Sequence, residues 1–435
     1  MTGGFIFCPG SKTAGQGLGE KDELLNMRGK WPIMFYMRKY AHVFLRLLCL
    51  FAVVEFLSWA GLVYLRDVRR VYLGLDCRNI LDFQQRKLIK NMLRGRLQYL
   101  KISPTLGWTV QPDGKTDMYQ ANGQGIRASW EAVQSSPRGR IRVCAFGDSF
   151  IHGDEVYNHE TWQEILTRDH SNMEVLNFGV PAYGLDQSFL RYQEEGAGFK
   201  PDFVIIGLTL DDMPRHVNTF RPFWTPSSQV PLSKPRFVFK NGSLVLIPNL
   251  LRTHEDYERL LKTPQSVLPD LGEEDYYYKH ARCRESRPTF FCIRLADLAL
   301  RLFLNARLKS RDVSLASFWG AESEFFIITR EILKKFRDEA LAQGAVPLVV
   351  IFPSRHDLRV FEKESFHVYQ PVHFYLRDHN FAYIDLMSHF VEEIPSPELD
   401  TLFAPQGHLS ARGHRLVAEI IFDYFGRQGW SSPSR

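Results

Sequence analysis

The chain of 435 residues is long enough for one large domain with additions or for two domains of modest size. Its hydrophobic fraction of 45% is that of an ordinary globular protein, and its formal net charge of +5 is small for this length. Because no basic stretch is interleaved with aromatic residues, the sequence gives no reason to expect a nucleic-acid partner.

An apolar run at residues 43–65 predicts a helix that crosses a membrane once. About 20 apolar residues are enough to cross the hydrocarbon core as a helix. Arg46 lies near one end, where its side chain can reach the interface, whereas Glu55 lies near the middle and must be protonated or paired there. The alternative is a buried amphipathic helix of a soluble domain. The run lies too far from the first residue for an ordinary cleaved signal peptide.

Residues 1–42 are then expected to form a cytoplasmic tail, and residues 66–139 a stalk and lead-in segment. Nearby basic residues are equally numerous on the two sides of the run, so the positive-inside rule leaves the orientation open. The basic stretch at residues 86–101 favours either a solvated stalk helix or a helix lying on anionic headgroups. Residues 103–128 are rich in turn-forming residues and predict a loop with short strands.

From residue 140 to residue 430, short apolar strands alternate with helical patterns. The predicted strands are residues 141–146, 175–180, 203–208, 346–352 and 382–386. The predicted helices are residues 161–166, 185–195, 322–343 and 411–425. Alternation of this kind predicts an α/β fold with a parallel sheet that is covered on both faces.

A large insertion, at about residues 213–318, interrupts this alternation. Within it, residues 237–247 predict a hairpin, because Asn241 and Gly242 suit a type I′ turn between apolar strands. An insertion after the carboxyl end of a strand lies where ligands bind in open α/β sheets, so it could be a lid or a substrate platform. It could equally be a surface addition. Its aromatic residues could stack on sugar rings or pack in the insertion's own core; they are Phe220, Phe223, Trp224 and Tyr276 to Tyr278.

A candidate nucleophile, Ser149, follows the first predicted strand within the tripeptide Gly147-Asp148-Ser149. Gly147 allows a sharp turn, which would place Ser149 at the carboxyl edge of the sheet, near backbone N–H groups. A turn with a capping serine is the alternative. The GxSxG motif of other α/β esterases is absent.

A candidate base, His408, precedes the last predicted helix, for which Ser410 is a suitable N-cap. Histidine is the usual general base because its ordinary pKa is near neutrality. A loop at this position can reach the edge of the sheet that carries Ser149, although a histidine of a surface loop is the alternative. His414 falls inside or near the helix and is expected to be structural.

Four blocks of sequence resemble, in order, those of the SGNH (GDSL) hydrolase family. They are GDSF at residues 147–150, NFGVPAYG at 177–184, residues 207–212, and HLSARGH at 408–414. The resemblance covers about residues 140–426 and implies a flavodoxin-like three-layer α/β/α sandwich. It implies that Ser149 is the nucleophile, that His408 is the base, and that Ser149 and Gly179 supply backbone N–H groups to an oxyanion.

Further stretches, SPTLGW and KPDFVIIG, resemble membrane-anchored bacterial SGNH proteins that act on cell-surface polysaccharide. This similarity implies a single-pass protein of the inner membrane with its catalytic domain in the periplasm or outside the cell. It also implies an acylated carbohydrate or another ester as substrate.

Two positions depart from the family pattern. Asp211 stands where the family has an asparagine that donates to the oxyanion, and a carboxyl group can donate only when protonated. Another group could fill that role instead. Pro405 stands three residues before His408, where the family has an aspartate that orients the histidine. We expect Asp400 or Asp385 to supply that acid, or the pair to act as a dyad.

Three functions remain open on these residues. The first is an ester hydrolase, such as a carbohydrate esterase or deacylase, that works through an acyl-serine. The second is an O-acyltransferase that modifies an exported polysaccharide with the same serine, and the third is a degenerate domain that binds glycan without catalysis. No His, Asp or Cys residues have the spacing of metal ligands, so we expect no metal and no other cofactor. Cys283 and Cys292 could form a disulfide or remain thiols.

Overall fold

The computed structural model describes residues 19–69, 80–133, 139–210, 212–225, 227–279, 290–308, 320, 322–364 and 369–430. The chain divides into two compact units. The smaller consists of Met1–Tyr64 and Pro288–Ala296, and the larger of Leu65–Arg287 and Asp297–Arg435.

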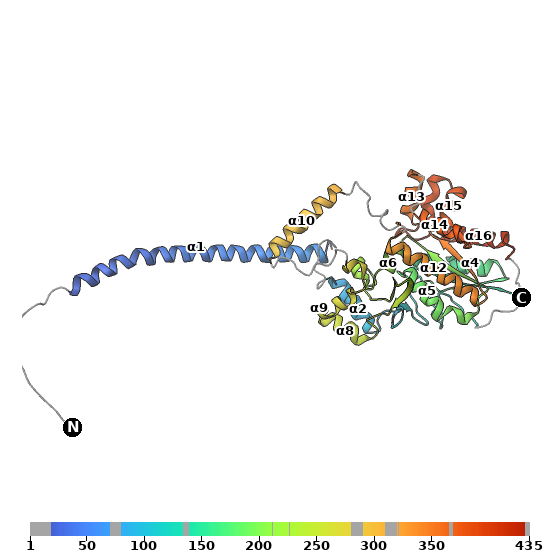
Figure 1. Ribbon diagram of the computed structural model, residues 1–435, viewed down its shortest axis with the longest axis horizontal. Helices are drawn as coiled ribbons and strands as arrows, with labels where there is room; N and C mark the ends of the chain where they lie inside the picture. Colours follow the sequence, from blue (N-terminus) through green and yellow to red (C-terminus); the bar gives the residue numbers. More distant parts are fainter. Residues whose placement is uncertain are drawn as a thin grey trace, which may run out of the picture. The chain divides into compact units, whose positions relative to one another are not determined.

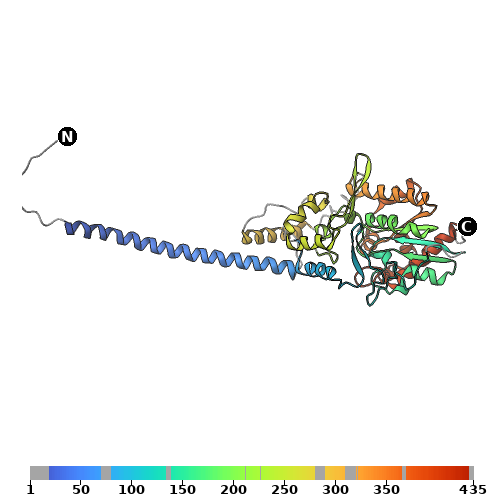
Figure 2. The ribbon, with the colours of Figure 1, turned by 90° about the horizontal axis from the view of Figure 1, so that it is seen from below.

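The smaller unit is built on one long helix, α1 (Gly19–Asp67), which Figures 1 and 2 show as a continuous rod. Its segment Tyr40–Leu65 has a mean hydropathy of 2.0 and is long and apolar enough to cross a membrane. The predicted span at residues 43–65 falls inside this segment. Helix α10 (Phe291–Leu308) begins against α1. Cys283, which the sequence suggests as a disulfide partner of Cys292, lies outside the described residues, so this disulfide stays a prediction.

The larger unit is organised around a parallel sheet of five strands. They are β3 (Ile141–Phe146), β4 (Met173–Asn177), β5 (Phe203–Leu208), β8 (Val346–Ile351) and β9 (Tyr383–Asp385). The order across the sheet is β4-β3-β5-β8-β9, which is the flavodoxin-like order of a doubly wound fold. Nearly every strand residue is buried, as apolar strands with helices on both faces must be.

Helices cover the two faces of this sheet in the pattern that right-handed crossovers require. Helix α4 (Trp162–Asp169) packs against α16 (Ala411–Arg427) on one face. Helix α5 (Leu185–Glu194) packs against α12 (Glu324–Ala342), which contacts β8 on the other (Figure 1). Helices α13 (Arg355–Glu364), α14 (Gln370–Asp378) and α15 (Leu386–Glu393) complete the second half. The α/β/α architecture expected from the sequence is therefore confirmed.

The lead-in and the insertion add smaller elements. The lead-in forms α2 (Phe83–Leu93) and a hairpin of β1 (Leu100–Ser103) and β2 (Gly107–Val110). The insertion forms α6 (Asp212–His216), α7 (Arg221–Trp224), β6 (Arg236–Lys240), β7 (Ser243–Ile247), α8 (His254–Lys262) and α9 (Pro264–Gly272).

The hairpin of the insertion has the turn that its sequence predicts. Strands β6 and β7 pair antiparallel, and Asn241 and Gly242 have φ values of 52° and 77°, as a type I′ turn requires. A buried ion pair between Lys234 and Asp186 joins the insertion to α5. Phe220 and Phe223 are buried, so these two aromatic rings belong to the core and are not free to stack on a sugar.

Candidate active site

The candidate nucleophile lies at the turn between strand β3 and a short helix. Strand β3 ends at Phe146, and α3 (Ser149–His152) begins at Ser149. A Cβ atom on Gly147 would lie 2.3 Å from Cγ1 of Ile151, so only glycine fits this turn. The Asp148 side chain caps α3 by accepting the N–H of Phe150 at 2.9 Å. Ser149 is thereby fixed at the carboxyl end of the sheet.

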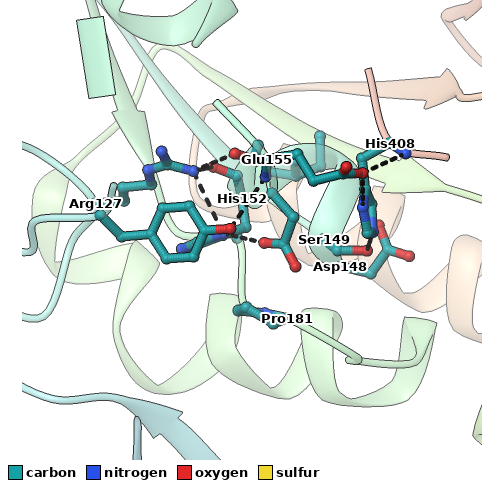
Figure 3. A network of polar contacts seen from close by, with 12 residues as sticks. Arg127, Asp148, Ser149, His152, Glu155, Pro181 and His408 are labelled. Carbon is teal, nitrogen blue, oxygen red and sulfur yellow. Dashed lines mark hydrogen bonds and ion pairs between the residues drawn. The ribbon is translucent and has the colours of Figure 1, made fainter. Parts of the chain in front are cut away.

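The side chains of Ser149, His408 and Glu155 form a continuous relay (Figure 3). Ser149 and Glu155 come from the segment after β3, and His408 from the loop before α16. His408 Nε2 lies 2.9 Å from Ser149 Oγ, and His408 Nδ1 lies 2.9 Å from Glu155 Oε2. The ring of His408 is also 5.5 Å from that of Phe150, measured between centroids. The geometry suits a hydroxyl that gives its proton to an imidazole, with a carboxylate to orient that ring.

The carboxylate of Glu155 also fixes the backbone of the loop that carries the histidine. Its Oε1 accepts the N–H of Gln406 at 2.7 Å, and its Oε2 accepts the N–H of His408 at 3.1 Å. The Glu155 side chain is only 10% exposed, so these hydrogen bonds form with little competition from water. Glu155 therefore holds both the ring and the loop of His408.

The expectation that Asp400 or Asp385 orients His408 is wrong. Asp400 is exposed and pairs with Arg359 at 2.9 Å. Asp385 accepts the hydroxyl of Tyr369 at 2.9 Å and pairs with His373 at 3.1 Å. Both ring nitrogens of His408 already face Ser149 and Glu155, which leaves neither position for these aspartates.

Sequence reasoning missed Glu155, which follows Ser149 by six residues across the turn at Gly153. Glu155 has a φ of 69°, a left-handed conformation that a residue with a side chain rarely adopts. Such a backbone persists only where surrounding contacts impose it. The one signal in the sequence is the short distance between Glu155 and the nucleophile.

Arg127 imposes the conformation of the loop that carries Glu155 by binding three of its backbone carbonyls. Its Nη1 donates to the carbonyls of His152 and Gly153 at 2.6 and 2.5 Å, and its Nη2 donates to that of Val156 at 2.6 Å. Arg127 is 2% exposed. Three carbonyls that flank Glu155 are thus bound to one rigid, planar cation, as Figure 3 shows for its contacts with residue 152.

A second, buried polar chain lies beside the first. His152 Nε2 lies 2.6 Å from the hydroxyl of Tyr99, and its Nδ1 lies 2.5 Å from Oδ1 of Asp154. Burial, reinforced by the charge of Arg127, lowers the pKa of His152 to about 4, so the ring is neutral at neutral pH. Burial also raises the pKa of Tyr99, which therefore keeps its proton and donates to His152.

The backbone N–H of Gly179, expected to serve an oxyanion, is engaged elsewhere. It donates to Oδ1 of Asn177 at 2.9 Å. A Cβ atom on Gly179 would lie 2.2 Å from the backbone nitrogen of His152, so this glycine is needed for close packing against α3. The same sequence block continues into a turn in which Ala182, after Pro181, has a φ of 65°.

The third block can be followed only in part, because Asp211 lies outside the described residues. Its neighbours approach the nucleophile through Asp148. Thr209 donates its hydroxyl to Oδ2 of Asp148 at 3.2 Å, and Arg215 pairs with the same oxygen at 2.6 Å. Residues in and just after the third block therefore bind Asp148, the residue that precedes Ser149.

A cavity of about 640 Å³ opens beside the relay. Its walls come from the relay, the lead-in and the insertion. They include Glu155, His408, Asp154, Tyr99, Tyr119, Leu88, Met92, Arg96, Gln229 and Val230. The lining combines apolar and polar side chains, which suits an organic ester better than a bare ion. Among the described residues, no group of His, Cys, Asp and Glu could hold a metal ion.

Comparisons with known proteins give similarities in fold. No protein-family model and no curated protein matches the chain. A lipase/acylhydrolase from Enterococcus faecalis is 14% identical and covers 68% of this chain and 98% of its own, with a TM-score of 0.34. A member of the lipolytic G-D-S-L family from Veillonella parvula is 15% identical and covers 66% and 99%, with a TM-score of 0.32.

A psychrotrophic esterase from Pseudoalteromonas sp. is 10% identical and covers 66% of this chain and 97% of its own, with a TM-score of 0.33. These three solved structures are described as a lipase/acylhydrolase, a lipolytic protein and an esterase. At such identities the likeness concerns the fold, and at these TM-scores no conclusion about activity rests on it.

Proposed function

We propose that this chain is a serine ester hydrolase of the SGNH type, in which Ser149 attacks the ester and His408 takes its proton. The observation that carries this proposal is the unbroken relay from Ser149 Oγ through the ring of His408 to Glu155, with both contacts at 2.9 Å. A serine hydroxyl is a weak nucleophile at its ordinary pKa and needs a base within hydrogen-bond reach.

The reaction proceeds in two acyl transfers. As Ser149 Oγ bonds to the ester carbonyl carbon, its proton passes to Nε2 of His408, and the imidazolium is stabilised by Glu155. The bond from carbon to the alcohol oxygen then breaks, and the alcohol leaves with the proton held by His408. Water repeats the sequence on the acyl-serine and releases the carboxylic acid.

The developing oxyanion needs donors placed where its charge forms. The N–H of Ser149, the first residue of α3, is one donor in this proposal. Asp211 is the second candidate and acts only when protonated. Replacing it by asparagine raises activity if Asp211 is ionised and gives no gain if it already donates, which esterase assays of Asp211→Asn measure directly.

The proposed substrate is an acylated carbohydrate presented outside the cytoplasm to an enzyme held in the inner membrane by residues 43–65. Helix α1 supports the anchoring, and the cavity beside His408 supports an ester with a bulky part. The side chain of His408 is 24% exposed, so water reaches the base, which favours hydrolysis over acyl transfer to a sugar. A complete relay favours catalysis over glycan binding alone.

The test is the esterase activity of the full chain in detergent or nanodiscs. Ser149→Ala is expected to abolish hydrolysis of p-nitrophenyl acetate and of acetylated glycans, together with covalent labelling by a serine-directed phosphonate. Ser188→Ala, which removes a buried hydroxyl on α5, is the matched control and is expected to retain both. A wild-type chain as inert as Ser149→Ala in all three assays contradicts the proposal.

A further inference from the structure

Glu55 is the acidic residue in the middle of the apolar segment Tyr40–Leu65 of α1. At about 1.5 Å per residue, this segment is longer than the roughly 30 Å of hydrocarbon that it would cross. Wherever the hydrocarbon lies along it, Glu55 is at least about 8 Å inside. A carboxyl group at that depth is costly unless it is protonated or supplied with hydrogen-bond donors.

The donors come from the first turn of α10. The carboxylate of Glu55 accepts the backbone N–H of Phe291 at 2.7 Å and that of Cys292 at 3.0 Å. The first N–H groups of a helix have no partner within the helix and carry partial positive charge. The carboxylate therefore supplies an acceptor to these N–H groups, and they supply donors to it. An unpaired donor or acceptor costs the most free energy where water is absent.

Apolar contacts extend this junction on both sides of Glu55. The ring of Phe290 meets that of Phe51 edge to face, with 5.2 Å between centroids. Further along α1, Gly61 lies under Leu295, whose side chain would be 3.8 Å from a Cβ atom at that glycine. The segment that begins α10 is thus packed along α1 within the part that is apolar enough to cross a membrane.

Helix α10 itself has a side on which apolar residues stay exposed. Ile293, Leu300 and Phe303 are 48%, 56% and 53% exposed. Arg294 and Asp297 lie on a neighbouring side of the helix, at helical spacing from each other. A helix with this division lies in a membrane with its apolar side toward the acyl chains. The ring of Phe291 lies under the guanidinium of Arg294, whose long side chain can extend toward the headgroups.

We propose that α10 is a second membrane-embedded element, which starts inside the bilayer at Glu55 and lays its apolar side on lipid. The inference rests on the proposed membrane anchoring by α1: the occupant of that side is the bilayer, because α10 begins on the segment of α1 that we propose crosses it. The membrane contact of the chain is then a helix pair, held together by a buried carboxylate cap. This inference does not depend on the proposed esterase activity.

The test places an environment-sensitive fluorophore at residue 300 of the full chain in proteoliposomes, on a background in which the six native cysteines are replaced. The matched control is residue 341, since Leu300 and Leu341 are both leucines that are 56% exposed on a helix. We expect a label at Leu300→Cys to be quenched by doxyl-labelled lipid and protected from aqueous iodide, and a label at Leu341→Cys to behave in the opposite way. A label at residue 300 quenched by iodide overturns the proposal, and so does one quenched by neither, which would indicate a protein partner.

The cap is tested by two substitutions of Glu55 read with the same label. Glu55→Leu leaves the N–H groups of Phe291 and Cys292 without an acceptor and is expected to abolish lipid quenching at residue 300. Glu55→Gln retains an acceptor oxygen and is expected to keep it. A label at Leu47→Cys on α1 reports whether the anchor itself remains in lipid. Undiminished quenching at residue 300 in Glu55→Leu overturns the role of the carboxylate.

Discussion

The carboxylate of Glu155 accepts hydrogen bonds from three groups of the segment that carries His408, the proposed base. They are the N–H of Gln406, the N–H of His408 and, at Nδ1, the ring of His408. In the proposed mechanism, a carboxylate in this position fixes the tautomer of the histidine and stabilises the imidazolium that would form when Ser149 gives up its proton. Removing its charge affects the transition state while leaving most of the geometry in place.

We therefore expect Glu155→Gln to lower kcat/KM for p-nitrophenyl acetate by up to about 10⁴-fold, with a much smaller effect on KM. The amide oxygen keeps one backbone contact but cannot balance an imidazolium. Asp400→Asn removes a carboxylate that pairs with Arg359 and is expected to leave kcat/KM unchanged. Equal losses in the two variants would rule out Glu155 as the orienting acid.

At this scale the sequence predicts the two side chains that the structure brings into contact, Ser149 and His408, and misses Glu155, which holds His408 in place. Ser149 and His408 stand out because each occupies a loop at the carboxyl edge of a recognisable strand or before a helix. Glu155 does not stand out, because its role depends on a left-handed backbone that residue type alone does not indicate. Gly179 was interpreted as a donor to substrate, whereas its N–H and its missing side chain both serve contacts within the protein.

The loop from His152 to Val156 acts as one element, and Arg127 is its support. Without the guanidinium, the carbonyls of His152, Gly153 and Val156 lose their donor, at a cost of about 1–3 kcal/mol for each one that stays buried. The left-handed backbone at Glu155 then loses the contacts that impose it. Arg127 is accordingly a positioning residue that acts on His408 through Glu155.

We expect Arg127→Met to lower both the free energy of unfolding and kcat, measured under conditions where the chain remains folded. Arg142→Met is the matched control, since Arg142 is equally buried and pairs with Glu174 at 2.6 Å, away from the site. It is expected to lower stability alone. In Arg127→Met combined with Glu155→Gln, kcat should fall no further than in Glu155→Gln; additive losses would show that Arg127 acts independently.

The sequence predicts the existence of the strands more accurately than the residues at which they end. Strands at residues 141–146 and 203–208 match the sheet residue for residue, because continuous apolar runs of that length fit a doubly covered strand. The strand predicted at residues 175–180 is instead Met173–Asn177, since the side chain of Asn177 turns back on the N–H of Gly179. Apolar residues continue beyond this point, so hydrophobicity alone placed its end too late.

At the scale of the whole molecule, three histidines among the described residues of the α/β unit are fully buried. Burial, the largest cause in each case, lowers the pKa of His152 to about 4 and the pKa values of His216 and His414 to about 3. In the unfolded chain, histidine has a pKa of about 6.5. Between these values the unfolded state binds a proton at each site that the folded state does not, so the free energy of unfolding falls as the pH falls.

Each such histidine contributes a slope of about 1.4 kcal/mol per pH unit between roughly pH 6 and pH 4. Buried Asp186 and Asp275, whose pKa values are raised by burial, oppose the histidines at the acidic end of this range. The total slope is therefore smaller than three histidines alone would give. A comparison between the wild type and a single variant isolates one histidine from this background.

His216 is the site that allows this comparison. Its Nε2 lies 3.0 Å from the carbonyl oxygen of Phe325, a contact that the amide nitrogen of glutamine can reproduce without taking up a proton. We expect His216→Gln to reduce the slope of unfolding free energy against pH by about 1.4 kcal/mol per unit between pH 6 and pH 4. Denaturant unfolding of the detergent-solubilised chain, followed by tryptophan fluorescence, measures it. An unchanged slope would mean that His216 is already protonated in the folded protein, which its burial beside Lys234 and Arg236 argues against.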